Sequence, residues 1–414
     1  MKKLSYLTCM LLCSFMPSVA QPQILVMPTG GKPMPDRWID ATTHHLIVKL
    51  SRREGSNSSF YFHNYPFIQT PDGKGWEMIY YGSTSQGNQL FAVNLQTFQN
   101  RQITHLPFRF GGEIVAPKSK TAYVQSRDSV FRIHLGNGKA ELVYVFPNDF
   151  HGHIASVNCN ETLLAGVWSD EREAEILRRY PSKSSFFNRI FEAHIPHVLF
   201  TIDLQTKQLH KIDSEDTWLN HEQFSPTDPD LLLYAHEGPW DQVDRTWVIN
   251  VKTGEKKLLH QRSIPHEING HEWWAPDGKS VWFDLQIPRS VNFYIAGVPV
   301  KNENGHIETG KEIRYPITRD EWSIHFNLSP DQTMFCGDGG DSTQVAHARD
   351  GMWIYLFRKQ GDTLSAEKLV DMRFQNYRAL EPNVHFSPDG KWVIFRANFE
   401  GKNEVYAVSI QRYL

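Results

Sequence analysis

The sequence has few cysteines, no long apolar run and little net charge, and each absence excludes a class of protein. Only 4 cysteines occur in 414 residues, and Cys9 and Cys13 lie within the first twenty. Cys159 and Cys336 are far apart, so we expect no disulfide framework. No segment of the mature chain approaches the ~20 continuous apolar residues of a membrane span. The formal net charge is -3, which gives no indication of nucleic acid or an anionic membrane as a partner.

The first twenty residues have the pattern of a secretory signal peptide. Lys2 and Lys3 precede an apolar run, and Ser18-Val19-Ala20 supplies the small residues of a cleavage site. We therefore expect cleavage after Ala20 and a secreted domain over residues 21–414, in a bacterial periplasm or at the cell exterior. A lipoprotein anchored through Cys13 is less favoured, because Leu12 is not the small residue that such a signal requires.

The chain is rich in one short repeat. Turn-like Pro-Asp or Pro-Lys phrases followed by apolar, β-branched runs begin near Pro71, Pro117, Pro226, Pro276, Pro330 and Pro388, and a degenerate copy begins at Val157. A second turn and another strand-like run follow most of them. Short strands repeating about every 40 to 60 residues are typical of propeller blades. The seven copies predict an all-β fold, a single-domain, seven-bladed β-propeller.

Two segments lie outside this repeat. Residues 170–196 have a helical pattern, which predicts a short helix-containing insertion over one face of the ring. A surface loop and a lid beside a binding cleft are both compatible with that pattern. Residues 43–51, THHLIVKLS, precede the first repeat. If this strand pairs with the last blade, it closes the ring and leaves no exposed sheet edge.

Three repeats carry a histidine four residues before the Ser-Pro or Ala-Pro: His221, His271 and His325. The fourth copy has Asn383 there. Because the innermost strands of a propeller line its channel, residues at one repeat position converge at one level. A single histidine before a turn usually bonds the turn backbone, but Ser or Asp suffices for that task. Three equivalent histidines therefore favour metal binding or proton transfer, for which imidazole is well suited.

Residues suited to an anionic sugar lie near these histidines in the sequence. The block AHEGPWDQVDRTW contains His236 and Arg245, and QNYRALEPN contains Arg378. Arginine can hold a carboxylate through two parallel hydrogen bonds. Trp240 is a candidate for stacking on a sugar ring, although tryptophan inside a blade is more often part of the core.

The stretch WLNHEQFSPTDPDLLLYAHEGPWDQVDRTWVIN, together with GHEWWAPDG and SIHFNLSPDQ, resembles the corresponding blocks of the oligogalacturonate lyases, polysaccharide lyase family 22. The resemblance extends from about residue 218 to the C-terminus and more weakly through the first blades. It implies a seven-bladed propeller enzyme that cleaves short galacturonate oligomers by β-elimination, with a histidine base, an arginine and a manganese-type divalent ion. On the matching positions, the base corresponds to His271, the arginine to Arg245 and the first metal ligand to His325.

One block departs from the family's pattern. The family takes its other ligands from a Gln-x-x-His-x-His run, where this chain has Arg378, Glu381 and Asn383. Glu381 and Asn383 offer oxygen donors to a hard divalent ion. Arg378 cannot be a ligand, and its charge is suited to pairing with the substrate carboxylate. A divalent-metal site at His325, Glu381 and Asn383 and a metal-free site both stay open.

The same departure leaves the substrate open. Other uronate-cleaving propeller lyases act on rhamnose-glucuronate links or ulvan with His, Tyr and Arg and no catalytic metal. For that reaction His63 and Tyr65, in the stretch FYFHNYPF, become candidate substrate-binding residues. The alternative interpretation of this stretch is an aromatic inner strand.

The requirements of β-elimination assign the remaining roles. A neutral base, for which we choose His271, takes the C5 proton, while Arg245, Arg378 or a divalent ion stabilises the developing charge. His221, His236 or water positions the substrate or protonates the C4 oxygen. A glycoside hydrolase would need a pair of flanking carboxylates, and none is clear. A non-catalytic propeller that binds carbohydrate or protein is compatible with the fold, and the sequence does not set the oligomeric state.

Overall fold

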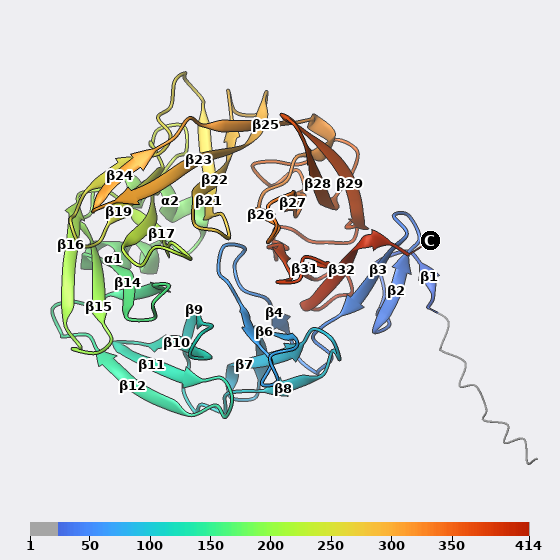
Figure 1. The fold of residues 1–414 in the computed structure, drawn as a ribbon, viewed down its shortest axis with the longest axis horizontal. Helices are drawn as coiled ribbons and strands as arrows, with labels where there is room; N and C mark the ends of the chain where they lie inside the picture. Colours follow the sequence, from blue (N-terminus) through green and yellow to red (C-terminus); the bar gives the residue numbers. More distant parts are fainter. Residues whose placement is uncertain (1–23, 414) are drawn as a thin grey trace, which may run out of the picture.

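The computed structural model describes residues 24–413, which form a ring of seven β-sheets around a central channel (Figure 1). Within each blade, neighbouring strands pair antiparallel from the channel outward, except at the rim of the last blade, where residues 26–27 pair parallel with residues 39–40. The all-β, seven-bladed propeller is therefore confirmed. The signal-peptide prediction falls on residues 1–20, outside the described part of the chain.

Six blades follow the chain order. Blade one contains β4 (Asn57–Ser58), β5 (Phe67–Gln69), β6 (Trp76–Thr84), β7 (Gly87–Asn94) and β8 (Asn100–Gln102). Blade two contains β9 (Gly111–Ala116), β10 (Thr121–Ser126), β11 (Ser129–His134) and β12 (Ala140–Val145). Blade three contains β13 (His153–Val157), β14 (Leu163–Ser169), β15 (His197–Asp203) and β16 (Leu209–Glu215).

The next three blades carry the histidine repeats. Blade four contains β17 (Leu219–Phe224), β18 (Leu231–His236), β19 (Thr246–Asn250) and β20 (Lys256–Leu258). Blade five contains β21 (Ile268–Trp274), β22 (Ser280–Gln286), β23 (Phe293–Glu303), β24 (His306–Thr309) and β25 (Ile313–Ile317). The 3-10 turn η1 (Arg319–Glu321) leads into blade six, which contains β26 (Phe326–Leu328), β27 (Met334–Gly337), β28 (Trp353–Gln360) and β29 (Thr363–Asp371).

Blade seven is built from both ends of the chain. It contains β30 (His385–Phe386), β31 (Trp392–Ala397), β32 (Glu404–Arg412) and β3 (His45–Lys49), and β2 (Arg37–Asp40) and β1 (Val26–Met27) extend it at the rim. β3 pairs antiparallel with β32, and Ile47 lies opposite Val408. The ring closure expected for residues 43–51 is thus present, and it covers the sheet edge that β32 would otherwise expose.

The core lies between adjacent blades. Alternate residues of each strand face the neighbouring blade, so that one cluster combines Trp273 of blade five with Phe326 and Tyr355 of blade six. Burying one such large apolar side chain contributes roughly 1.5–3 kcal/mol. Repeated around the ring, these contacts hold the inner strands in fixed positions.

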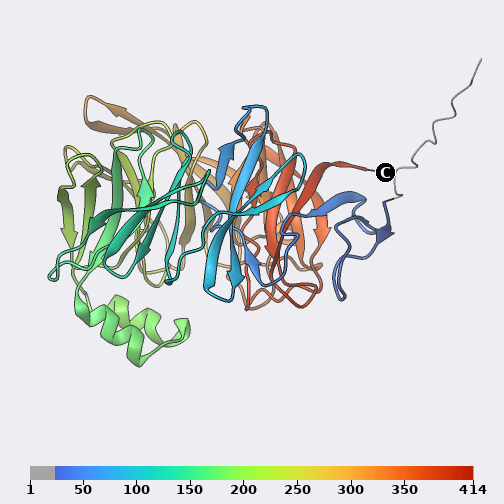
Figure 2. The ribbon, with the colours of Figure 1, turned by 90° about the horizontal axis from the view of Figure 1, so that it is seen from below.

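The predicted insertion is a pair of helices between β14 and β15. α1 (Glu171–Arg179) begins at Asp170, whose side chain caps it, and α2 (Lys183–Glu192) follows. Both lie against one face of the ring (Figure 2). α2 packs Phe187 on Trp218 at a centroid distance of 5.3 Å. None of the helices within residues 24–413 is long and apolar enough to span a membrane.

Residues 59–66, here called the channel segment, leave blade one between β4 and β5 and enter the central channel (Figure 1). The backbone N–H of Tyr61 donates to Glu113 at 2.6 Å, and its carbonyl oxygen accepts from His385 Nε2 at 3.2 Å. The fully buried Phe62 packs on the imidazole of His325, with centroids 4.9 Å apart. The channel is therefore partly filled by this chain's own side chains.

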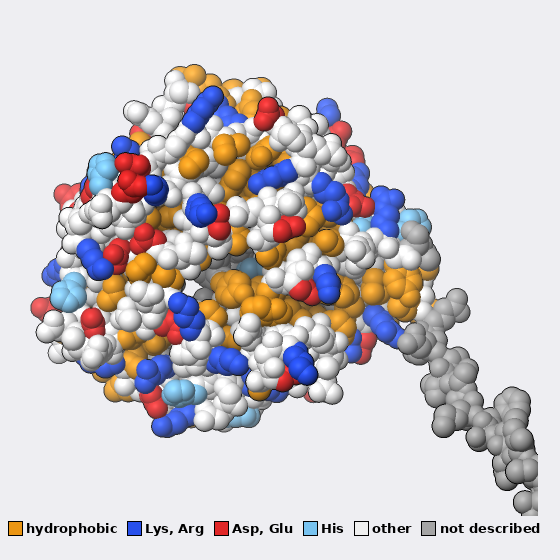
Figure 3. Space-filling model, viewed as in Figure 1, with side chains coloured by type: hydrophobic (Ala, Val, Ile, Leu, Met, Phe, Trp, Pro, Cys, Tyr) orange, Lys and Arg blue, Asp and Glu red, His pale blue; other side chains and the backbone are white. Residues whose placement is uncertain are grey.

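The face opposite the helices is formed by the Pro-containing turns of the repeats. It opens into a funnel of about 710 Å³ whose lining includes Tyr65, Pro226, Pro276 and Pro330. Figure 3 shows this hollow at the centre of the face, surrounded by hydrophobic side chains. The channel thus has two distinct mouths, separated by the channel segment.

Candidate active site

The histidines of the repeat gather at the channel mouth on the side of the helical insertion. The imidazole centroids of His271 and His325 are 4.5 Å apart. The ring of Tyr61 lies 5.3 Å from that of His325 and 5.7 Å from that of His221. Inner strands of blades four, five and six therefore surround a side chain of the channel segment.

Two of these histidines are oriented by a left-handed backbone conformation. His221 and His271 have φ values of 62° and 46°, in the left-handed region, as does Asn383 at 51°. The strand pairing shifts register next to both histidines, between Asn220 and Gln223 and between Gly270 and Trp273. A β-bulge redirects a side chain, and a left-handed residue other than glycine costs of order 1–3 kcal/mol. The surrounding blades hold this geometry in place.

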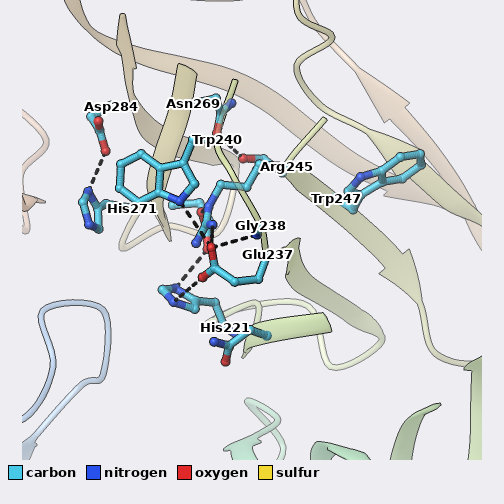
Figure 4. Close-up of polar contacts among 12 residues, drawn as sticks. His221, Glu237, Gly238, Trp240, Arg245, Trp247, Asn269, His271 and Asp284 are labelled. Atoms are coloured by element: carbon cyan, nitrogen blue, oxygen red, sulfur yellow. Dashed lines mark hydrogen bonds and ion pairs between the residues drawn. The ribbon is translucent and has the colours of Figure 1, made fainter. Parts of the chain in front are cut away.

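His271 has the environment of a general base. Its Nδ1 lies 2.9 Å from Asp284 Oδ1, and the Trp240 ring stands edge-on at 5.0 Å (Figure 4). Burial and the neighbouring His325 lower the pKa of His271 well below its ordinary value. Burial raises the pKa of Asp284 to about 7. When Asp284 is ionised, it accepts a hydrogen bond from the Nδ1–H of His271. The neutral imidazole then has no proton on Nε2, which can take one.

Arg245 lies in a compensated charge cluster. Its buried guanidinium donates from Nε to Glu272 at 2.9 Å and from Nη1 to Glu237 at 2.7 Å. His221 Nδ1 lies 3.1 Å from Glu272. Burial raises the pKa of Glu272, but Arg245 and His221 outweigh that effect and hold it well below the ordinary value. Figure 4 shows His221, Glu237 and Arg245 directed toward one another. The charge of Arg245 is already balanced by two carboxylates.

The predicted metal ligands lie together, but two of their donor atoms, His325 Nδ1 and Asn383 Oδ1, are engaged elsewhere. His325 Nδ1 bonds Asp338 at 2.7 Å, and its Nε2 lies 3.8 Å from Glu381 Oε2. Asn383 Oδ1 accepts from the backbone N–H of Phe62 at 3.1 Å, and its Nδ2 donates to the Glu381 carbonyl. Within residues 24–413, no group of three or more His, Cys, Asp or Glu side chains could hold a metal ion. The donors present do not fit a divalent-metal site, because the Asn383 oxygen is committed to the channel segment.

The other predicted residues are dispersed. His63 stacks on His221 with centroids 5.6 Å apart and also lines the funnel on the opposite face. Tyr65 is 49% exposed and lines the opposite funnel. Arg378 is exposed on the loop before β30. His236 stacks on Trp247 at 4.9 Å and contacts Glu215, so the structure does not bring it into the cluster.

Sequence reasoning missed the partners of the histidines. Asp284 follows His271, and Asp338 follows His325, by the same 13 positions. The spacing is equal because Asp284 lies on the second strand of its blade and Asp338 directly follows the second strand of the next, each beside the histidine of the first strand. A search for charged residues at a fixed offset from the repeat histidines would have found both.

Comparisons with known proteins identify the family of the chain. The oligogalacturonate lyase family matches residues 36–413. The oligogalacturonate lyase of Dickeya dadantii is 23% identical over 388 residues, covering 90% of this chain and 95% of the relative. The oligogalacturonide lyase of Pectobacterium atrosepticum is 24% identical over 392 residues, with the same coverage of 90% and 95%.

Two solved structures share the fold. The oligogalacturonate lyase of Vibrio parahaemolyticus aligns with a TM-score of 0.75 at 21% identity, covering 91% of this chain and 96% of that one. An oligogalacturonate lyase in complex with manganese aligns with a TM-score of 0.74 at 21% identity, covering 93% and 99%. The family match spans most of the chain, and so this propeller belongs to the oligogalacturonate lyase family.

Proposed function

We propose that this enzyme cleaves short, pectin-derived galacturonate oligomers by β-elimination, with His271 as the base. The observation that carries the proposal is the His271–Asp284 pair at the channel mouth, 2.9 Å between Nδ1 and Oδ1. An imidazole that is buried, oriented through Nδ1 and open at Nε2 is suited to removing a weakly acidic carbon-bound proton.

The bond changes follow from the reaction class. His271 Nε2 takes the C5 proton, the electron pair of the C5–H bond forms the C4=C5 double bond, and the C4–O4 bond breaks. The leaving oxygen needs a proton. In galacturonate the C5 hydrogen and the C4 oxygen lie on opposite faces of the sugar ring, so the base cannot also serve as the acid.

Tyr61 is placed to supply that proton. Its hydroxyl lies 3.4 Å from His325 Nε2, inside the histidine cluster. Burial, followed by the negative charges of Glu381 and Glu272, raises the pKa of Tyr61 well above its ordinary value. The phenol therefore keeps its proton at neutral pH and can donate it to the departing oxygen.

The first test is the ultraviolet absorbance of the unsaturated uronate, followed with oligogalacturonate and, separately, with a rhamnose-glucuronate oligomer. We expect a rise on oligogalacturonate that His271→Ala abolishes and that His306→Ala, a substitution at an exposed histidine far from the mouth, preserves. A rise only on the glucuronate oligomer would redirect the substrate assignment. No rise on either substrate from folded protein would favour a binding propeller.

Repeating the same assay with a chelator tests whether the activity requires a divalent metal ion. The manganese complex belongs to a relative, and the engaged donors around Asn383 lead us to expect full activity after chelation. Loss of activity on chelation with recovery on adding Mn²⁺ would show that His325, Glu381 and Asn383 rearrange to bind an ion.

We also propose that the protein is exported and matured after Ala20. The support is the basic start, apolar run and small-residue site of residues 1–20. Intact-mass measurement on protein recovered from a periplasmic or culture fraction should give a chain that begins at Gln21. A full-length mass from the cytoplasmic fraction alone would contradict export.

A further inference from the structure

The last blade departs from its neighbours at one repeat position. Asp284 and Asp338 each follow the repeat histidine by 13 positions, and Arg396 follows Asn383 by the same interval. The pairing of β30 with β31 continues this register, because His385 lies opposite Ile394. The position that carries a histidine-orienting carboxylate in blades five and six therefore carries a cation in blade seven.

Arg396 bonds only neutral atoms. Its Nε donates to the Glu381 carbonyl at 2.9 Å, and its Nη1 donates to Ser58 Oγ at 2.9 Å and to the Ser59 carbonyl at 3.0 Å. No carboxylate among residues 24–413 forms an ion pair with it. A half-buried guanidinium without a counter-ion is costly, and it becomes favourable when an anion binds.

The surroundings of Arg396 match the place where a substrate carboxylate must bind. Its contacts Ser58 and Ser59 lead directly into the channel segment that carries Tyr61, and Glu381 faces His325 at 3.8 Å. His325 in turn lies against His271. Because C6 is bonded to C5, the group that holds the carboxylate must lie near the base that takes the C5 proton.

The other candidates for this role are less suited. Arg245 is compensated by Glu237 and Glu272, and the donors at Asn383 and His325 are engaged. Glu113 and Glu381 act on Arg396 through space without forming an ion pair, and Glu113 is engaged by the Tyr61 N–H and by Asn64. A cation is nevertheless required, because removing the C5 proton places negative charge on the carboxylate.

We propose that Arg396 is the residue that binds the C6 carboxylate of the uronate whose C5 proton is removed. The assignment rests on the proposed β-elimination. It makes Arg396 a determinant of the preference for a free carboxylate over its ester.

The test compares oligogalacturonate with its C6 methyl ester, which still has an acidic C5 proton but no anionic charge. Wild-type enzyme should prefer the free acid. Arg396→Gln should lower kcat/KM for the acid by about 10²- to 10³-fold and change that for the ester by less than about threefold. Arg396→Lys should restore part of the preference, since it keeps the charge.

Arg53 provides a matched control, because it also bonds only neutral groups, Asn57 Oδ1 and the Ser83 carbonyl, both at 2.6 Å. Arg53→Gln should leave the acid-to-ester ratio unchanged, and thermal unfolding should show that every variant is folded.

An equal loss on both substrates would indicate a structural role and overturn the assignment, as would unchanged activity in Arg396→Gln. Wild-type enzyme that cleaves acid and ester equally well would overturn it even if the Gln variant did not fold. Wild-type enzyme inactive on all uronates would instead overturn the proposed function, and this assignment with it.

Discussion

His271 and His325 differ in their protonation because their surroundings differ. His271 and His325 both face an aspartate, yet the pKa of His271 is lowered, by burial and by His325, whereas that of His325 is raised, because Asp338 outweighs the opposing effect of burial. One imidazole is thereby kept neutral and its neighbour favours the proton. Neighbouring groups whose pKa values move apart are a recurrent feature of acid–base sites.

Asp284→Asn should therefore lower kcat by roughly 10²- to 10⁴-fold with little change in KM, because the amide no longer fixes the Nδ1–H tautomer of His271. Steady-state kinetics on oligogalacturonate would measure this. The more distant substitution Asp338→Asn should have a smaller effect on kcat, and a larger effect there would assign the base to His325.

The pH profile provides a second residue-scale prediction. Burial raises the pKa of Asp284 to about 7, so the His271–Asp284 pair takes up a proton near that pH and loses its free base. In wild-type enzyme kcat/KM should rise with pH through about 7 and then level off. In Asp284→Asn the residual activity should stay constant as the pH falls to below 6.5. The reason is that only the lowered pKa of His271 then sets the fraction of enzyme with a free base. An identical midpoint in both proteins would contradict the coupling.

At the scale of elements, the helical insertion supports the site. Phe187 packs on Trp218, whose carbonyl accepts from the N–H of Glu237, and Phe191 lies against Gly238, where a Cβ would come 2.5 Å from its ring. The insertion thus holds the chain on both sides of Glu237, a partner of Arg245. A cover for the mouth is the alternative role, because the insertion lies on the same face of the ring.

These two roles can be separated. Ser169 and His197 are directly paired, so a short Gly-containing turn can replace residues 170–196 without breaking the hairpin. We expect folded protein with kcat reduced about 10- to 100-fold, because a small misplacement of the charge cluster is costly to catalysis. The double variant Phe187→Ala, Phe191→Ala should reproduce this loss, and Leu177→Ala on α1 should not.

If the shortened protein loses affinity for longer oligomers while the double variant keeps wild-type kcat, the insertion acts as a cover rather than a support. The kcat and KM values of both proteins, measured with oligomers of several lengths, decide between the two.

The elements also show what the sequence could and could not predict. Turn phrases followed by β-branched runs predicted the blades. The equivalent positions of His221, His271 and His325 predicted that their side chains lie at the same depth in the channel. Both predictions depend only on local repetition. Tyr61 could not be found in this way, since it enters the channel from a segment outside the repeat. Arg396 and the two aspartates required a pairing register, which depends on bulges such as those beside His221 and His271. His236 was misleading because it belongs to the second strand, where its ring faces Trp247.

For the whole molecule, stability depends on closing the ring through β3. Ile47 is fully buried opposite Val408, so Ile47→Ala should lower the free energy of unfolding by about 2–5 kcal/mol. Ile313, 43% exposed on the outer strand β25, offers a control for which we expect less than about 0.5 kcal/mol. Urea denaturation followed by tryptophan fluorescence would measure both. Equal effects would mean that closure contributes little.

Blade seven pairs β3, near the start of the chain, with β32, at its end. The ribosome therefore releases β3 early in synthesis and β32 last. In a nascent chain β3 can pair with β2, but its other edge has no partner until Glu404–Arg412 has been made, and such an edge is prone to pair with other chains. A translation product truncated before β32 would be expected to aggregate rather than to persist as a six-bladed fragment. Any chaperone that assists this protein must therefore shield the beginning of the chain until its end arrives.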